Sequence, residues 1–125
     1  MIDRKGILQF NKAKGDVGES LAVEYLKNSG YEIIETNLKN KMAEVDIIAK
    51  KGDCFHFVEV KYRKSLQFGS GRDAVAGYKQ NRIKAAANLW LTKNKLMYKM
   101  KSCFDVIEIH ALDGGNKITH LINCY

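Results

Sequence analysis

Two carboxylates and a lysine stand at a spacing that could support hydrolytic chemistry. Asp46 lies in one β-rich run, and Glu59 and Lys61 lie in the next, with Gly52-Asp53 between the two runs. Glycine can adopt the positive φ that a tight turn requires, so this dipeptide predicts a β-hairpin. If Gly52 and Asp53 are the two turn residues, antiparallel pairing places position 46 directly opposite position 59.

This pairing would gather the charges into one cluster. Directly opposed Cβ atoms lie roughly 5 Å apart, and two carboxylates at that distance repel unless a cation or a shared proton lies between them. Because side chains alternate along a strand, Glu59 and Lys61 share a face with Phe57. An exposed cross-strand ion pair is the simpler interpretation. The apolar neighbours of the charges favour a buried cluster instead, where each charge needs a partner.

The chemistry that suits such a cluster is metal-assisted hydrolysis. Hard oxygen ligands select Mg²⁺ or Mn²⁺, which take one or two protein carboxylates plus substrate phosphate. A bound divalent ion polarises a phosphoryl oxygen and lowers the pKa of a bound water. Lys61 would orient or deprotonate that water, or stabilise the charge that develops on phosphorus.

The composition favours a polyanionic partner. The chain has 125 residues, which suggests a single domain over 1–125, and 46% of them are hydrophobic, as in ordinary folded proteins. The net charge of +7 makes nucleic acid the first candidate partner and an acidic membrane the second, with a merely basic soluble protein as the alternative. The absence of a signal-like segment and of a membrane-length apolar run predicts a soluble, unexported protein.

The cysteines and histidines are interpreted as structural or surface residues. The three cysteines are widely spaced and contain no C-x-x-C pair, which favours a reducing cytoplasm, and no histidine stands at metal-ligand spacing from them. These cysteines and histidines are Cys54, Cys103, Cys124, His56, His110 and His120. Asp105, which opens a strand-like run, is interpreted as a turn cap.

Two amphipathic helices are expected to frame the hairpin, over residues 15–29 and 73–93. Each carries an apolar stripe with helical periodicity, and Gly30 stands where a helix C′ glycine belongs. The stripes consist of Val17, Leu21, Ala22, Tyr25 and Leu26 in the first helix, and of Val75, Ala76, Ile83, Ala86, Ala87 and Trp90 in the second.

Each helix also carries a charged residue next to its stripe. Glu19 either lies at the edge of the buried stripe or is a solvated first-turn carboxylate favoured by the helix dipole. Lys79 lies four residues from both Val75 and Ile83, and either extends past the core to solvent or points at a buried anion site. Arg82 is interpreted as an exposed basic residue.

Strand-like runs at residues 31–38, 104–112 and 117–122 complete the expected elements. The last two flank residues 113–116, Asp-Gly-Gly-Asn, which is a hairpin signal. The order of helix, three strands, helix and two strands predicts an α/β domain with a mixed sheet and helices packed on it. Residues 1–12 are either a flexible arm or the start of a helix.

A basic loop is expected directly after the predicted hairpin. Residues 69–71, Gly-Ser-Gly, favour a flexible connection, and Arg63, Lys64 and Arg72 lie around it. A basic loop beside a metal cluster suits a polyanionic substrate, and an ordinary solvated connection is the alternative.

Several motifs together resemble one protein family. They are Gly18-Glu19, Gly30-Tyr31, Glu44-Val45-Asp46, Phe57-Val58-Glu59-Val60-Lys61, and Ala74-Val75 with Lys79. Over most of its length the chain resembles the YraN-like family, within the PD-(D/E)XK restriction-endonuclease-like superfamily that includes the archaeal Holliday-junction resolvases. One departure is Ala43, where the family usually has glycine, and it would alter how closely backbone or substrate approaches the strand start.

The resemblance implies a central mixed β-sheet flanked by α-helices, and Mg²⁺-dependent (or Mn²⁺-dependent) cleavage of DNA phosphodiester bonds. The roles it implies are metal ligation by Asp46, Glu59 and the main-chain carbonyl of Val60, catalysis by Lys61, an accessory carboxylate at Glu19, and DNA or phosphate contact by Lys79.

Two functional hypotheses follow from the resemblance and the charge. The first is a structure-selective endonuclease that acts on branched or single-strand-containing DNA in repair, recombination or uptake. The second is a non-catalytic nucleic-acid-binding protein that keeps the site for structure, because fold does not imply function. A homodimer would supply the two sites needed to cut both strands or to clasp a four-way junction.

Overall fold

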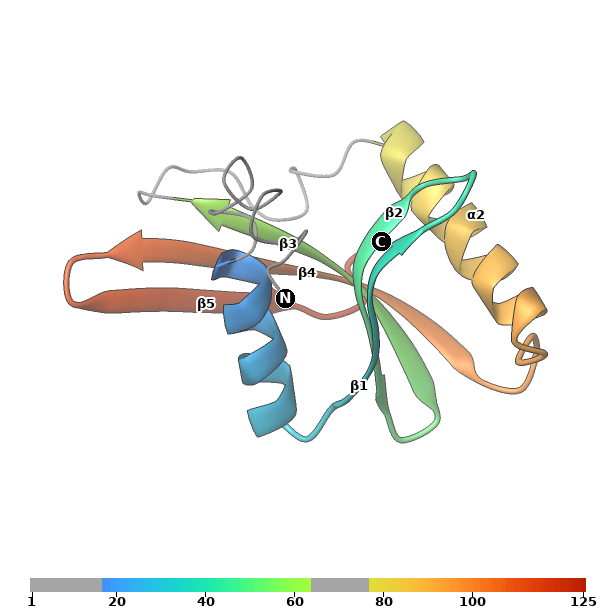
Figure 1. Cartoon of the computed structure of the whole chain (residues 1–125), viewed down its shortest axis with the longest axis horizontal. Coiled ribbons are helices and arrows are strands. Elements are labelled where there is room, and N and C mark those ends of the chain that lie inside the picture. The colour runs from blue at the N-terminus through green and yellow to red at the C-terminus, as the bar shows by residue number, and fades with distance from the viewer. Residues whose placement is uncertain (1–16, 64–76) are drawn as a thin grey trace, which may run out of the picture.

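The structure, a computed structural model, describes residues 17–63 and 77–125. Within these ranges an N-terminal helix (residues 17–28) precedes three strands, a second helix and two further strands, which confirms the predicted order (Figure 1). The labelled elements are β1 (Glu32–Lys39), β2 (Glu44–Lys51), β3 (Cys54–Arg63), α2 (Gly77–Lys93), β4 (Lys101–Leu112) and β5 (Gly115–Leu121).

The described strands form one mixed sheet in the order β1-β2-β3-β4-β5. All neighbours pair antiparallel except β3 and β4, which pair in parallel. A parallel pair needs a crossover connection, and α2 lies in the segment that joins β3 to β4. The arrangement is that of an α/β, restriction-endonuclease-like core, as the sequence predicts.

The central hairpin has the predicted register. Gly52, with φ of 62°, begins the two-residue turn between β2 and β3. The ladder pairs Ile47 with Val58, and the same register carried one residue further places Asp46 opposite Glu59.

The C-terminal hairpin differs from the prediction at both of its strands. Its turn consists of Asp113 and Gly114 alone, because Gly115 already pairs with Leu112 and opens β5. Gly114 takes φ of 87°, a value that lets two residues close the turn. β4 begins at Lys101, three residues earlier than expected, because the parallel ladder with β3 starts there.

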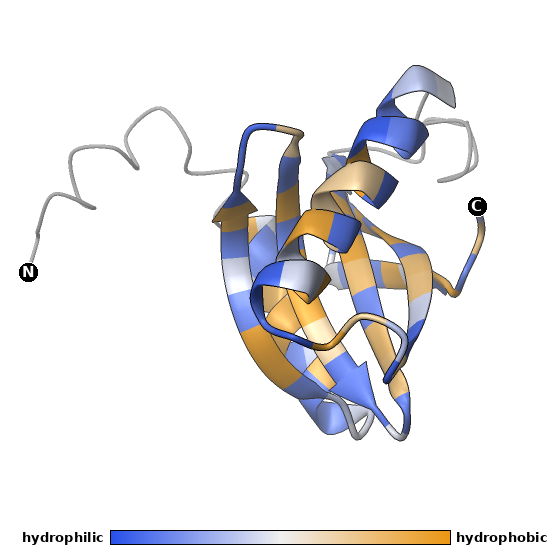
Figure 2. Ribbon diagram, turned by 90° about the vertical axis from the view of Figure 1, so that its right-hand side faces the viewer, coloured by the Kyte–Doolittle hydropathy of each residue, from blue (hydrophilic) through white to orange (hydrophobic). Residues whose placement is uncertain are grey.

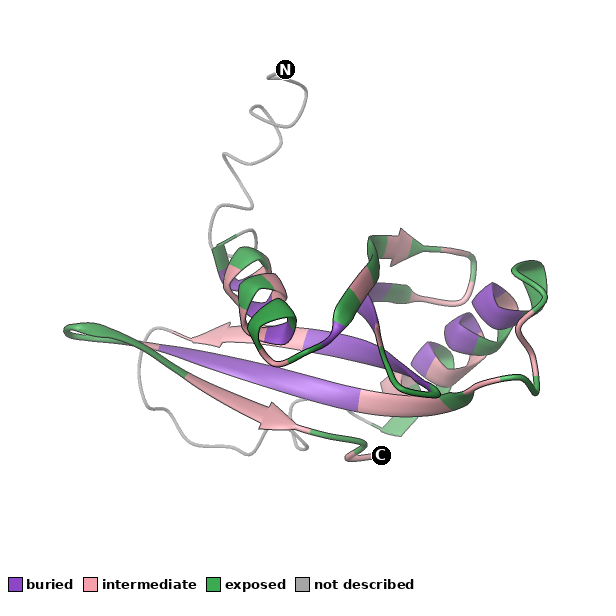
Figure 3. Cartoon of the chain, turned by 90° about the horizontal axis from the view of Figure 1, so that it is seen from below, coloured by how far each residue is buried: buried purple, intermediate pink, exposed green. Residues whose placement is uncertain are grey.

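Two apolar clusters cover the two faces of the β2–β3 hairpin. Side chains alternate between the two faces of the sheet along both strands. Hydrophobic segments lie on the strands of the sheet and on α2 (Figure 2). Ile48 and Phe57 pack with α2, whereas their neighbours Ile47 and Val58 pack with the N-terminal helix. Buried residues fill the first part of β3, from Cys54 to Glu59, and the middle of β4 (Figure 3).

The helical stripes are largely as expected. In the N-terminal helix Ala22 and Leu26 are fully buried, but Val17 is 48% exposed and does not belong to the stripe. In α2 the four expected stripe residues within the described part, Ile83, Ala86, Ala87 and Trp90, are buried, and Val75 and Ala76 lie outside the described residues. Neither helix, as far as the structure describes it, has the length and hydropathy needed to cross a bilayer.

Candidate active site

Asp46 joins the two central strands through its side chain. Its Oδ2 accepts a hydrogen bond from the backbone N–H of Val60 at 2.8 Å. The ladder between β2 and β3 ends at Ile47 and Val58, although both strands continue. The carboxylate therefore takes a backbone donor at the point where regular pairing between these strands stops.

Glu59 lies beside this bond and is held by two lysines. The residue is only 8% exposed, and its Oε2 lies 3.0 Å from Nζ of Lys79 and 3.5 Å from Nζ of Lys61. Lys79 comes from the first turn of α2, so the helix contributes directly to the cluster. Of the two arrangements considered for Lys79, the structure has the one that points at a buried anion.

Electrostatic effects link these groups. Burial and the neighbouring Glu59 carboxylate raise the pKa of Asp46 from 3.8 to about 6, although the Val60 N–H bond opposes the increase. Burial acts to lower the pKa of Lys79, but the hydrogen bond and charge of Glu59, together with the charge of Asp46, raise it overall. The cluster thus combines crowded carboxylates with the Lys79 ammonium group, whose pKa is raised.

Glu19 approaches the cluster from the N-terminal helix. It is half-buried, and its Oε1 accepts a hydrogen bond from Nδ2 of Asn37 in β1 at 2.9 Å. Its charge also contributes to the raised pKa of Asp46. The preceding Gly18 allows the close approach of this helix, because a Cβ there would lie 3.0 Å from Cβ of Tyr62 in β3.

The other predicted site residues are more dispersed. Nε of Arg63 lies 3.5 Å from Oε2 of Glu108, a buried carboxylate that pairs in register with Lys61 and that sequence reasoning did not single out. Arg82 is exposed on α2, as expected. Lys64, Arg72, the 69–71 loop and residues 1–12 lie outside the described residues.

A second polar cluster is built around Asp105. This residue is fully buried, and His56 Nδ1–H and His120 Nε2–H each donate to its Oδ2 at 2.8 Å. The backbone N–H of Asn123 donates to Oδ1 at 2.9 Å. Burial opposes ionisation of Asp105, but the bonds from His120, His56 and Asn123 lower its pKa overall. Asp105 is therefore the buried centre of a network, not a simple turn cap.

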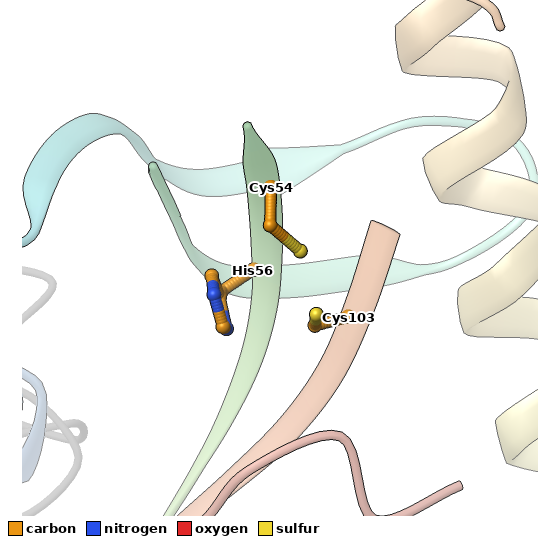
Figure 4. A group of neighbouring side chains, drawn as sticks. All are labelled: Cys54, His56 and Cys103. Atoms are coloured by element: carbon orange, nitrogen blue, oxygen red, sulfur yellow. The ribbon is translucent and has the colours of Figure 1, made fainter. Parts of the chain in front are cut away.

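Cys54, His56 and Cys103 lie next to this network. Their nearest ligand atoms, two sulfurs and a ring nitrogen, all lie within 4.8 Å of one another (Figure 4). The sequence shows no metal-ligand spacing among these residues, but the parallel pairing of β3 with β4 places His56 in register with Cys103 and brings the three together. The sequence feature that could have predicted this group is Cys-x-His at residues 54–56, because that spacing places two ligands on one face of a strand.

Comparison with known proteins matches the sequence to one family. The profile of UPF0102, described as an uncharacterised protein family, matches residues 18–109. A UPF0102 protein of Syntrophomonas wolfei is 41% identical over 116 residues, which cover 93% of this chain and 100% of that protein. One from Clostridium botulinum is 44% identical, covering 92% of this chain and 95% of its own length. One from Trichlorobacter lovleyi is 42% identical, covering 92% and 91%.

Proposed function

Since the chain belongs to the UPF0102 family, which is the YraN-like family, we propose that it is a metal-dependent endonuclease that hydrolyses DNA phosphodiester bonds. The observation that carries this proposal is the convergence of Asp46 and Glu59 from paired strands with Lys61 and Lys79. Both lysines contact the same carboxylate oxygen, which concentrates two acids and two cations in one small volume.

The donor set fits a hard divalent cation. Asp46 and Glu59 offer carboxylate oxygens from opposed strand positions, and their mutual repulsion raises the pKa of Asp46. A cation between them would remove that repulsion. These two residues, with the main-chain carbonyl of Val60 as the predicted third ligand, would hold Mg²⁺ or Mn²⁺. When bound, such an ion supplies a polarised phosphoryl oxygen and an activated water.

The two lysines have separable roles. Lys79 makes the shorter contact with Glu59, 3.0 Å against 3.5 Å for Lys61, and its side chain is 38% exposed, so an entering phosphate can reach it. Lys79 would exchange Glu59 for a phosphate oxygen and so position the DNA. Lys61, on the same strand as Glu59, would orient the attacking water or stabilise charge on phosphorus.

The charge of the whole chain supports a nucleic-acid substrate. The net charge is +7, and Arg82 adds an exposed cation on the helix that carries Lys79. Cations on this helix would contact phosphates next to the one being cleaved, and such contacts contribute affinity without sequence preference.

The test is cleavage of labelled duplex, single-stranded, flap and four-way-junction DNA, with Mg²⁺, with Mn²⁺ and with chelator. We expect metal-dependent cuts by the wild type and their loss in Glu59→Ala. Glu44→Ala is the matched control, since the Glu44 side chain is 67% exposed and pairs with Lys39, which is also exposed. Nicking that persists unchanged in Glu59→Ala would reject the site. Tight binding with no cuts by any form would favour the non-catalytic binding protein.

A further inference from the structure

The Cys54, His56 and Cys103 side chains lie on the face of the hairpin opposite the carboxylate cluster. Cys54 and His56 alternate with Phe55 and Phe57, whose rings contact Trp90 of α2 at 5.3 and 6.0 Å between centroids. Glu59 follows Phe57 on the α2 face. The sulfur and nitrogen atoms therefore belong to a separate region that the proposed hydrolysis does not use.

The three ligand atoms form a compact, protected set. They lie within 4.8 Å of one another, and Cys54 and His56 are 8% and 6% exposed, while Cys103 is half-buried. Zinc bonds of about 2.3 Å to sulfur and 2.0–2.1 Å to nitrogen would draw these atoms closer by about 1 Å, within reach of small side-chain rotations. Thiolate and imidazole ligands select zinc over Mg²⁺, so this set differs in chemistry from the carboxylate cluster.

The hydrogen bond of His56 to Asp105 is of the kind that zinc-binding histidines make. His56 Nδ1–H is bonded to the buried Asp105 carboxylate at 2.8 Å, which leaves the lone pair on Nε2. Histidines that bind metals commonly donate their other ring N–H to a carboxylate, which fixes the tautomer and the ring orientation. Tyr31 packs edge-on against the ring at 5.0 Å and further restricts it.

We propose that Cys54, His56 and Cys103 bind one zinc ion, with Asp105 as the carboxylate that orients His56. A water molecule would take the fourth position, because no fourth protein ligand joins the group among the residues that the structure describes. The ion would link the first residues of β3 to the first residues of β4. These strands are neighbours in the sheet but are separated in the sequence by α2.

The first test is zinc binding by the full chain. Protein stripped with chelator is titrated with ZnCl₂ against a chromophoric chelator, and bound metal is counted by mass spectrometry. We expect one zinc per chain, and with Co²⁺ a sulfur-to-metal charge-transfer band. Cys103→Ser should lower zinc affinity more than about 100-fold, since even the outer partners of zinc ligands contribute 10–100-fold. Cys124→Ser, which changes a half-buried cysteine outside the group, should not change the affinity.

A second measurement covers the case in which Cys103→Ser fails to fold. In the wild type, zinc should slow alkylation of Cys54 and Cys103 and leave the rate at Cys124 unchanged, as read by peptide mass spectrometry. The proposal is overturned if the folded wild type binds no zinc, if Cys103→Ser binds it equally well, or if all three cysteines are protected alike. A disulfide between Cys54 and Cys103 in protein purified without reductant would also overturn it.

Discussion

At the scale of single residues, the carboxylate cluster is an arrangement that lowers stability. Asp46 is ionised only against burial and against the charge of Glu59, and these effects raise its pKa to about 6. Its neighbour Glu59 is contacted by two lysines. An amide at position 46 could keep the Val60 N–H bond without this charge, so the retained carboxylate supports the cation proposed above.

The first prediction concerns Asp46→Asn. The folded protein holds the Asp46 proton more tightly than the unfolded chain does, so stability falls as pH rises from about 4 through 6. The amide can still accept the Val60 N–H bond but carries no charge. The difference between 3.8 and about 6 corresponds to about 3 kcal/mol, and we expect a gain of about 1–2 kcal/mol at pH 7.5 because Asp46 is only partly buried.

The measurement is urea unfolding in chelator, followed through Trp90, the one tryptophan of the chain. The gain in Asp46→Asn should shrink towards zero at pH 4, where the wild-type carboxyl is protonated in the fold. Glu44→Gln, at an exposed position, controls for the general loss of a negative charge. A gain that is the same at both pH values would contradict the assigned cause.

The second prediction separates Lys79 from Arg82 on the same helix. Lys79→Ala removes the 3.0 Å contact with Glu59 and the proposed phosphate contact, so cleavage at saturating DNA should fall by about 10–100-fold, the value of one or two charged hydrogen bonds. Arg82→Ala removes only an exposed cation and should weaken DNA binding with little change in the saturated rate. Single-turnover cleavage assays measure both effects, and equal losses in the two variants would remove the special role of Lys79.

At the scale of elements, the N-terminal helix and α2 each bring one charged residue to the hairpin. Gly18 lets the N-terminal helix approach Tyr62 closely, and Glu19 follows it. α2 presents Lys79 from its first turn while Trp90, near its other end, packs on Phe55 and Phe57. The helices therefore differ in how they are held, the first by close backbone approach and the second by aromatic packing.

The third prediction tests that difference with two glycines. In Gly18→Ala the new Cβ would lie 3.0 Å from Cβ of Tyr62, an atom that cannot swing away, so the helix must shift. This strain should outweigh the helix propensity of alanine and lower stability by about 1 kcal/mol. In Gly77→Ala no atom of the described residues lies within 4 Å of the new Cβ, and stability should rise by up to about 1 kcal/mol. Thermal unfolding gives both signs, and a stabilised Gly18→Ala would refute the close contact.

Local chemistry explains which elements could be predicted from the sequence. Gly52 sets a two-residue turn, and the register that places Asp46 opposite Glu59 follows from it. The neighbours of Asp105 could not be inferred in this way. His56 reaches it across the parallel β3–β4 pair and His120 from β5, and a parallel register depends on how a crossover helix packs, not on any turn residue.

At the scale of the whole molecule, the proposed activity requires a basic chain to bind DNA around an acidic cluster. The net charge of +7 attracts the phosphate backbone, whereas Asp46, Glu59 and Glu19 repel it at the point where cleavage is proposed. DNA binding is therefore weakened by the carboxylates, whereas metal-dependent cleavage requires them as ligands. A divalent cation would resolve this conflict, because it cancels the local negative charge without removing the ligands.

The last prediction uses this opposition to separate an enzyme from a binding protein. In chelator, Glu59→Gln keeps every cation and removes one negative charge, so affinity for duplex DNA at low salt should increase by several-fold, whereas Mg²⁺-dependent cleavage should be lost. The slope of log affinity against log salt, about 0.9 for each phosphate contacted, should stay unchanged in Glu59→Gln and fall by about one in Arg82→Ala. Glu24→Gln, at an exposed position of the N-terminal helix, controls for net charge. Fluorescence anisotropy over a salt series gives these values. If Glu59→Gln and Glu24→Gln change the affinity for DNA equally, Glu59 does not face the bound DNA. That result would reject DNA as the substrate of the proposed site.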